Sequence, residues 1–424
     1  MVTDKNSPKL KIGIFSDVQG YACKYDFGMA NLDKALQMLA GKQPDVLMMA
    51  GDLADDASDN VFTMYNDLCR KYFDKLPVNF ACAGNHDYWT SEPMGVRDAE
   101  AIYNNFCKKM EQPAENPLHS IINGYDFISM SEDCNSYSSE MVGKLEKEIQ
   151  KAVARDNKKP VFVVTHYPPA NTVCGSYRKY GNAELNAMFK KYPQVVSFSG
   201  HTHHPLVDER SIWQKEYTAV STSTLCYCCM VEDNYNTVNT ISPFAREVIN
   251  MLYMEVFDDR MEIHRYDVLS GKEIKPDDVW SVPLPFEPSS APYSFERRAA
   301  LRKAPEFPAD ADMLLRFDYG FIYLIFDNAG HDDFVHYYRV KISENGKVLF
   351  DERYVSDFYR MACHREDKRQ YFRLPNELIE PRHNYRFEVT PEESFGNAGK
   401  PLVLDALIPT RYRFRGKVEL FPQE

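Results

Sequence analysis

Long apolar stretches are missing from this sequence of 424 residues. No run reaches the length of about 18 residues that a membrane-spanning helix needs, so we expect no membrane span. Residues 1–10 are polar and lack the apolar segment of a signal peptide. This favours the cytoplasm, although a secreted or periplasmic protein whose signal had been removed would look the same.

The chain also lacks an obvious disulfide framework. Its ten cysteines are scattered, with one tight group at Cys226, Cys228 and Cys229. We expect reduced and mostly buried thiols. Metal binding by the tight group is disfavoured, because strand alternation would turn Cys228 and Cys229 to opposite faces.

Positive charge is scarce, since 50 Lys and Arg residues stand against 62 Asp and Glu residues, for a net charge of −12. Broad nucleic-acid binding needs a basic surface that displaces counterions, so we exclude that class of partner. A small phosphorylated substrate remains compatible, because bound divalent cations would reverse the field locally. Nothing in the sequence fixes the oligomeric state.

The length predicts two or three domains, and the first is α/β. Buried strands are predicted at Leu10–Phe15, Val46–Ala50 and 78–83, with amphipathic helices at Phe27–Ala40 and 61–73 between them. Further buried strands are predicted at 160–165 and Val195–Ser199. This alternation is typical of an α/β sheet covered by helices, in which ligands bind beyond the carboxyl ends of the strands. We assign this domain to residues 8–274.

The remainder of the chain changes character. Residues 275–312 are rich in proline and have no clear periodicity, which predicts an extended linker. Residues 313–424 contain seven short strand-like runs separated by turn signals such as Glu344-Asn345-Gly346. This pattern predicts an all-β sandwich that loosely resembles a fibronectin type III or immunoglobulin-like module. It carries no catalytic motif, so we expect an accessory domain.

Five short polar motifs, most of them after a predicted strand, carry the chemistry of the first domain. They are Asp17-Val18-Gln19, Gly51-Asp52, Gly84-Asn85-His86-Asp87, Thr165-His166 and Gly200-His201-Thr202-His203. Each alone has an ordinary explanation, such as an aspartate that caps a helix or a polar turn. Five such motifs in one domain, most of them after a strand, favour a single site that binds metal.

Carboxylate, amide and imidazole groups from several segments suit divalent cations. Asp52 could bridge two ions, and His201 and His203 can converge on one centre. Two ions roughly 3.5–4 Å apart can hold a phosphate and activate a bridging water or hydroxide. His86 would then face the leaving-group oxygen as an acid, and Asp87 could orient its ring.

The order D-x-(H/Q), G-D, G-N-H-D, H, G-H-x-H resembles the calcineurin-like metallophosphoesterase superfamily over about residues 10–268. The resemblance implies a four-layer αββα sandwich and hydrolysis of phosphoric esters at two divalent metal ions, Mn, Fe, Zn or a mixture. It assigns Asp17, Gln19, Asp52 and His203 to one ion. It assigns Asp52, Asn85, His166 and His201 to the other, with His86 as the catalytic acid.

Gln19 departs from the pattern, because most members carry histidine there. A glutamine oxygen is a neutral and weaker ligand than imidazole, so we expect lower affinity at the first site or a preference for Mn²⁺ or Mg²⁺. The alternative is that Gln19 is not a ligand. The branch that hydrolyses ADP-ribose and CDP-alcohols with manganese also has glutamine there, which favours a diester or pyrophosphate substrate.

We therefore predict hydrolysis of a phosphodiester or phosphoanhydride in a small phosphorylated, nucleotide-derived substrate. The alternatives are a phosphomonoesterase with the same site and a non-catalytic protein that binds a phosphorylated ligand. Near the motifs, Tyr21, Tyr88 and Trp89 could stack on a nucleobase, and Arg178 could bind a phosphate.

Overall fold

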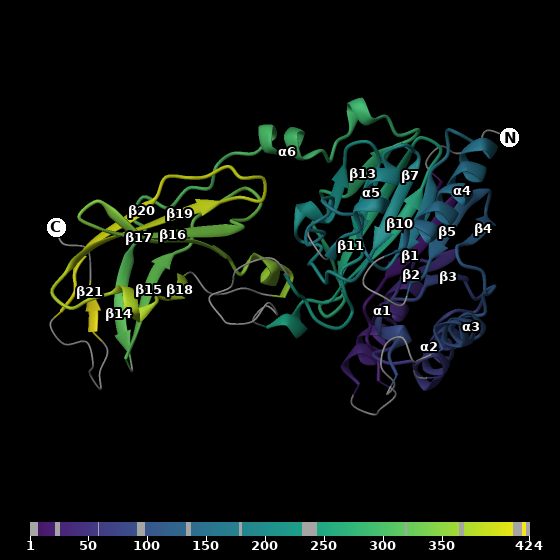
Figure 1. Ribbon diagram of the computed structural model, residues 1–424, viewed down its shortest axis with the longest axis horizontal. Coiled ribbons are helices and arrows are strands. Elements are labelled where there is room, and N and C mark those ends of the chain that lie inside the picture. Colours follow the sequence, from purple (N-terminus) through teal and green to yellow (C-terminus); the bar gives the residue numbers. More distant parts are fainter. Residues whose placement is uncertain are drawn as a thin grey trace. The chain divides into compact units, whose positions relative to one another are not determined.

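The structure is a computed structural model, and Figure 1 shows its chain from end to end. It describes residues 7–21, 26–57, 59–90, 98–132, 137–177, 180–230, 244–318, 320–363, 369–409 and 418–420. The chain divides into two compact units, and the boundary falls between Phe295 and Glu296. Within the described ranges, no helix combines the length and apolarity needed to cross a membrane.

The first unit contains two sheets. One has the order β12-β11-β10-β1-β2-β3, with β13 also paired to β11. Its strands are β1 (Leu10–Phe15), β2 (Val46–Ala50), β3 (Val78–Cys82), β10 (Asn250–Val256), β11 (Arg260–Asp267), β12 (Lys272–Ile274) and β13 (Trp280–Pro283). The pairs β1–β2 and β2–β3 are parallel, as the alternation of strands and helices predicts.

The second sheet has the order β4-β5-β6-β7-β9-β8. Its strands are β4 (Leu118–Ile122), β5 (Tyr125–Met130), β6 (Val161–Thr165), β7 (Val195–Ser199), β8 (Ile212–Gln214) and β9 (Thr218–Ser221). The pairs β5–β6, β6–β7 and β7–β9 are parallel, whereas the edge strands β4 and β8 pair antiparallel to β5 and β9. The inner faces of the two sheets meet, as shown by the edge-to-face contact of Phe80 on β3 with Phe127 on β5, at 5.5 Å between centroids.

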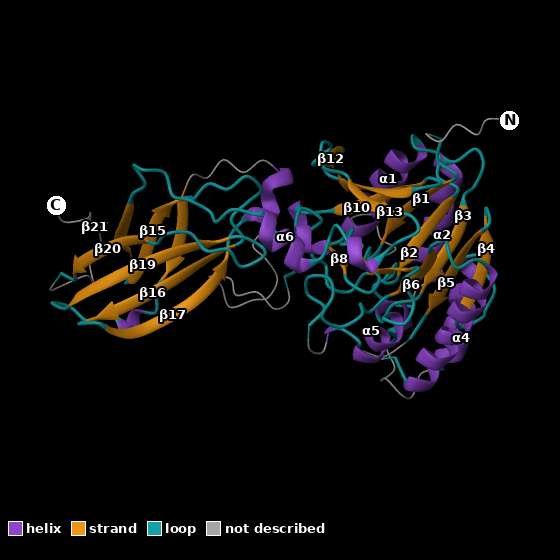
Figure 2. Ribbon diagram, turned by 90° about the horizontal axis from the view of Figure 1, so that it is seen from above, coloured by secondary structure: helices purple, strands orange, loops and turns teal. Residues whose placement is uncertain are grey.

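Helices cover the outer faces of both sheets (Figure 2). The helices are α1 (Phe27–Ala40), α2 (Asp59–Tyr72), α3 (Ala99–Lys109), α4 (Ser139–Arg155) and α5 (Ala183–Phe189). On α4, Val142, Leu145, Ile149 and Ala152 recur at helical spacing and are buried against the second sheet, and the Ser138 hydroxyl caps the helix by accepting from the Met141 N–H. The predicted four-layer αββα sandwich is therefore confirmed.

Part of the segment expected to be a linker, 275–312, belongs to the first unit. Trp280 and Val282 are fully buried and alternate with the exposed Ser281 and Pro283, so strand β13 pairs with β11 despite the proline content. The short helix α6 (Phe295–Leu301) follows at the boundary of the two units.

The second unit is the predicted all-β sandwich. Its two antiparallel sheets have the orders β18-β15-β14-β21 and β17-β16-β19-β20. The strands are β14 (Met313–Asp318), β15 (Phe321–Asp327), β16 (Tyr337–Glu344), β17 (Lys347–Val355), β18 (Arg369–Arg373), β19 (Asn384–Glu392), β20 (Leu402–Leu407) and β21 (Val418–Leu420). Leu315, Leu324, Val340 and Phe387 from both sheets form its core. The short strand β21 was not predicted.

The thiols also follow the expectation. Seven cysteines whose side chains the structure describes are free, and all of them are buried except the half-buried Cys226. Burial raises the pKa of Cys226 to about 12, so this thiol stays protonated at neutral pH.

A buried charged cluster fixes the segment that follows β7. The Glu209 carboxylate accepts from Arg265 at 2.8 Å, Lys275 at 2.7 Å and the indole N–H of Trp280 at 3.1 Å. Burial by itself would raise the pKa of Glu209, but the charges of Arg265 and Lys275 lower it to about 2. The cluster therefore joins the segment after the His201 and His203 motif to strands β11 and β13.

We predict that Glu209→Gln lowers the free energy of unfolding at pH 7 by about 2–3 kcal/mol, because each pKa unit corresponds to ~1.4 kcal/mol and glutamine retains part of the hydrogen bonding. The folded-state pKa of Glu209 is depressed, so its stabilisation is present above the ordinary value of 4.5 and is lost as pH falls toward 2. Urea unfolding at pH 7 and pH 3 measures the free energy of unfolding of wild type and Glu209→Gln. Glu140→Gln, at an exposed position, is the control. A difference that does not shrink at pH 3 contradicts the prediction.

Candidate metal centre

All five motifs lie at the carboxyl ends of parallel strands. Three follow β1, β2 and β3 of one sheet, and two follow β6 and β7 of the other. Because the two sheets face each other, these strand ends bring the side chains of both sheets to one region. The placement predicted from the sequence is thus the one observed.

The backbone at these strand ends is unusual. Five residues singled out from the sequence have positive φ angles: Asp17 (51°), Gln19 (46°), Asp52 (56°), His201 (65°) and His203 (52°). The left-handed region costs a residue with a side chain about 1–3 kcal/mol, and such residues concentrate at functional sites. The turns are held by hydrogen bonds between loops, such as those from the Asp17 N–H to Gly51 O and from the Gln19 N–H to Asp52 O.

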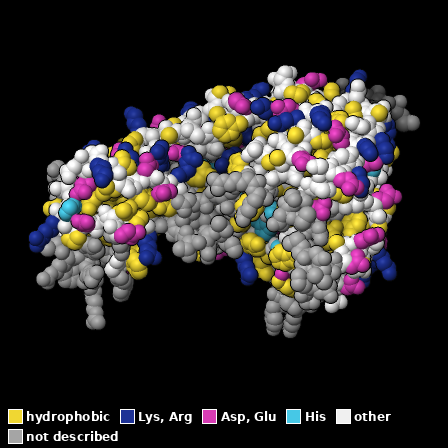
Figure 3. Space-filling view, in the orientation of Figure 1, with side chains coloured by type: hydrophobic (Ala, Val, Ile, Leu, Met, Phe, Trp, Pro, Cys, Tyr) yellow, Lys and Arg dark blue, Asp and Glu magenta, His cyan; other side chains and the backbone are white. Residues whose placement is uncertain are grey.

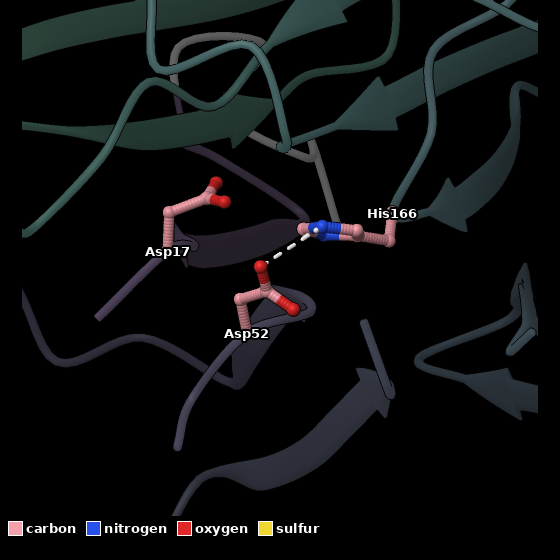
Figure 4. A group of neighbouring side chains, drawn as sticks. All are labelled: Asp17, Asp52 and His166. Carbon is pink, nitrogen blue, oxygen red and sulfur yellow. Dashed lines mark ion pairs between the residues drawn. The ribbon is translucent and has the colours of Figure 1, made fainter. Parts of the chain in front are cut away.

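Two buried carboxylates form the centre of the site, as Figure 4 shows for Asp17, Asp52 and His166. The Nε2 atom of His166 lies 3.1 Å from Asp52 Oδ2, and the Nε2 atom of His203 lies 3.0 Å from Asp17 Oδ1. One potential ligand atom from each of Asp17, Asp52 and His166 lies within 4.8 Å of the other two. These three residues alone could hold one cation.

Backbone carbonyl groups fix the orientation of two imidazole rings. The Nδ1 atom of His166 is 2.8 Å from Ala50 O, and the Nδ1 atom of His203 is 2.8 Å from Tyr227 O. Each Nδ1 therefore carries a proton and donates it, which leaves Nε2 as the atom that can bind a metal. This is the arrangement in which histidine ligands of metals are usually held.

Asn85 and His201 lie beside this pair. The Asn85 Oδ1 atom is 3.1 Å from His166 Nε2 and accepts from the Tyr167 hydroxyl at 3.0 Å. The His201 ring packs on Tyr167, with centroids 4.3 Å apart, and lies 5.0 Å from the His166 ring. Burial and the charge of His166 lower the pKa of His201 well below its ordinary value, so its ring is neutral, as a ligand must be.

His86 lies at the edge of the site and is partly exposed. Its Nδ1 atom is 3.0 Å from Asp55 Oδ1, and its Nε2 atom is 4.0 Å from Asp52 Oδ2. The Gln19 amide nitrogen lies 3.1 Å from the same Nε2 atom. Burial by itself would lower the pKa of His86, but the Asp55 hydrogen bond and the Asp52 charge raise it.

The carboxylate that contacts the His86 ring is therefore Asp55, whereas sequence reasoning assigned this role to Asp87. Asp87 accepts instead from the backbone N–H groups of Asp52, Gly84 and Ala54 at 2.8–2.9 Å. It joins two of the motif loops. Asp55 was missed, although its position three residues after Asp52, in the same loop, was the available signal.

The comparison with family models identifies the first unit. Residues 10–205 match the model described as calcineurin-like phosphoesterase. This part of the chain is therefore similar to calcineurin-like phosphoesterases. The match supports hydrolysis of phosphoric esters as the chemistry of the first unit.

Among curated proteins, the chain is similar to cyclic GMP-AMP phosphodiesterase SMPDL3A of Homo sapiens, with 24% identity over 200 residues, or 39% of this chain and 44% of that protein. The Bos taurus protein of the same name is 25% identical over 36% of this chain and 39% of its own length. The match spans less than half of either relative.

Two solved structures are similar to the chain at low identity. A dimetal phosphatase from Danio rerio has 9% identity and a TM-score of 0.42, over 66% of this chain and all of its own. Purple acid phosphatase PPD1 from yellow lupin has 14% identity and a TM-score of 0.46, over 65% of this chain and 55% of its own.

The donor set of this site fits divalent cations. Burial by itself would raise the pKa of the Asp17 and Asp52 carboxyls, but His203 beside Asp17 and His166 beside Asp52 lower both. Asp52 in turn raises the pKa of His166 to about 9, despite its burial. When the imidazoles are neutral, as metal ligands must be, the two buried carboxylates lack compensating positive charge, which metal ions would supply.

Two glycines of the site let the loops approach the proposed ligands closely. A Cβ atom at Gly84 would lie 2.8 Å from the His166 ring and still closer to Asp52 Oδ1. At Gly51, where φ is +85°, a Cβ atom would lie 2.6 Å from His166 Nδ1. Side chains at these two positions would displace the proposed ligands.

We predict that Gly84→Ala lowers the bound metal of protein purified with Mn²⁺ at least severalfold, because it displaces Asp52 and His166 together. Elemental analysis per chain measures the effect. The control is Gly143→Ala in α4, where a Cβ atom meets nothing within 4 Å and alanine adds about 0.5–1 kcal/mol of helix stability. Equal metal content in both variants would refute the role assigned to Gly84.

Proposed function

We propose that this metallophosphoesterase is a phosphodiesterase that hydrolyses a small, nucleotide-derived phosphodiester or phosphoanhydride at a site for two divalent metal ions. The observation that carries the proposal is the orientation of His86. Its Nδ1 atom lies 3.0 Å from Asp55 Oδ1, and its Nε2 atom faces the Asp52 carboxylate at 4.0 Å. A proton donor at the edge of a metal site is what departure of an alcohol or phosphate group needs.

The proposed ligands divide into two sets that share Asp52. One ion would be held by Asp17, Gln19, Asp52 and His203, and the other by Asp52, Asn85, His166 and His201. When bound, two such ions polarise the phosphoryl group, neutralise charge in the transition state and supply hydroxide at neutral pH. The carboxylate and imidazole ligands accommodate Mn, Fe, Zn or a mixture.

The residues around the ligands have separate tasks. Asp55 accepts from Nδ1 of His86, which leaves Nε2 to exchange a proton with the leaving oxygen. The Gln19 amide nitrogen lies 3.1 Å from that Nε2 atom, so it can donate to the ring and hold it in position when Nε2 carries no proton. A neutral amide is a weaker ligand than imidazole. The first ion would therefore be held mainly by the carboxylates of Asp17 and Asp52 and by His203.

Two observations favour a diester substrate. Gln19 matches the glutamine of the manganese-dependent branch that hydrolyses ADP-ribose and CDP-alcohols. The name of the relatives in Homo sapiens and Bos taurus states a nucleotide phosphodiester, cyclic GMP-AMP, as their substrate. The substrate class proposed for this chain is therefore small and nucleotide-derived.

We predict that His86→Ala lowers the rate of bis(4-nitrophenyl) phosphate hydrolysis by about 10²- to 10⁴-fold, the usual contribution of a general acid. Its metal content stays unchanged, whereas Asn85→Ala loses metal and activity together. His383→Ala in the second unit, a histidine 43% exposed, is the matched control. Equal activity of wild type and His86→Ala would exclude the proposed role.

Among substrates, bis(4-nitrophenyl) phosphate and ADP-ribose are expected to react faster than 4-nitrophenyl phosphate.

The two aspartates near His86 give a separate prediction. Asp55→Asn is expected to lower kcat by about 10- to 100-fold, the usual loss when the hydrogen-bond partner of an active-site histidine is changed, with metal content intact. Asp87→Asn places an amide N–H₂ group among three backbone donors, so it is expected to lower metal content and thermal stability instead. Elemental analysis, thermal melts and kcat measurements distinguish the two. Identical effects of the two substitutions would contradict this assignment.

A further inference from the structure

A large aromatic side chain is exposed beside the proposed active site. Trp89 is 42% exposed, and Tyr21 on a neighbouring loop is 52% exposed. The other aromatic candidate in this region, Tyr88, is 3% exposed and packs in the core of the first unit. Tyr88 is therefore a core residue, whereas Trp89 and Tyr21 are accessible to a ligand.

The exposed tryptophan stands on a hydrogen-bonded set of loops. The Trp89 carbonyl accepts from the Ala57 N–H at 2.7 Å, and the Trp89 N–H donates to His86 O at 2.9 Å. The loop of Ala57 is joined in turn to Gly20, which accepts from the Asp55 N–H at 3.1 Å. The backbone of Trp89 is thus fixed relative to Asp55 and His86, so its exposure does not reflect a loose loop end.

The position of the indole is set by contact with His86. The two rings have centroids 3.7 Å apart and an interplanar angle of 35°. Figure 3 shows histidine side chains reaching the surface of the first unit next to hydrophobic side chains. If His86 faces the leaving oxygen, the group attached to that oxygen emerges beside the indole.

We propose that Trp89 is a stacking surface for a flat aromatic ring on the leaving-group side of the substrate, such as a purine, a pyrimidine or an aryl group. This inference rests on the proposed function, which puts the leaving group at His86. Indole offers a wide apolar face with a small loss of side-chain freedom, and every nucleobase has a face that can stack on it. Trp89 would select substrates by the leaving group and not by the phosphate.

The deciding experiment measures binding, so that it can be read without turnover. Isothermal titration of Mn²⁺-loaded protein compares two pairs of phosphonates, whose C–P bonds the enzyme does not hydrolyse. One pair is phenylphosphonate and methylphosphonate. The other is the methylene phosphonate analogue of adenosine monophosphate and the same compound without its base. The two pairs distinguish a general aromatic preference from a nucleobase preference.

Stacking on an aromatic side chain changes a dissociation constant by about 5- to 100-fold. We expect wild type to bind the aromatic member of at least one pair more tightly by such a factor. Trp89→Ala removes most of this preference, Trp89→Phe restores part of it, and Ile121→Ala, a control at a side chain 56% exposed on β4, leaves it unchanged. The methylphosphonate affinity of each variant, measured alongside, reports whether the metal site is intact.

Two outcomes would overturn the inference: a wild type with no preference in either pair, or a preference that survives in Trp89→Ala. Failure of the proposed function is a different result, namely no hydrolysis of bis(4-nitrophenyl) phosphate by the metal-loaded wild type. A protein that prefers aromatic phosphonates through Trp89 but hydrolyses nothing would support the stacking surface and refute the phosphodiesterase.

Discussion

The burial of two carboxylates, Asp17 and Asp52, is the constraint on which the first unit depends. Buried like charges are stable only when positive charge and hydrogen bonds compensate them. Imidazole Nε2 atoms lie 3.0–3.1 Å from both carboxylates, and backbone carbonyls hold the opposite nitrogens of the same rings. The positive φ angles at the strand ends and the glycine at position 84 follow from the need to bring these groups so close.

Much of this fold and site could be predicted from the sequence, because the motifs follow strands whose apolar runs are unmistakable. An apolar run such as Val46–Ala50 predicts a buried strand. Because Gly51-Asp52 follows it directly, the run also predicts that Asp52 lies at the carboxyl end of that strand. The sandwich of the second unit was predictable for a similar reason, since its strands alternate and are separated by turn residues. Patterns of this kind are local, so they can be recognised without knowing which other strands pair with the segment.

What could not be predicted depends on contacts between loops. Adjacency suggested Asp87 as the partner of His86, but in a tight 3₁₀ turn neighbouring side chains diverge, and the Asp87 carboxylate lies among backbone donors. Asp55 reaches the ring because the loop after β2 lies against the turn after β3. Strand β13 was missed because composition suggested a linker, whereas pairing with β11 and burial of Trp280 determine its structure.

The site draws its residues from both sheets, with Asp17, Asp52 and Asn85 from one and His166, His201 and His203 from the other. Ions bound to such a set connect two layers of the sandwich that are otherwise held together by apolar packing such as that of Phe80 on Phe127. Because the ligands converge only in the folded chain, the free energy of binding adds to the stability of the folded state. If the ions bind as proposed, their removal would lower the stability of the sandwich as well as stop its chemistry. Metal-free protein would then be more susceptible to unfolding and degradation than the metal-loaded form.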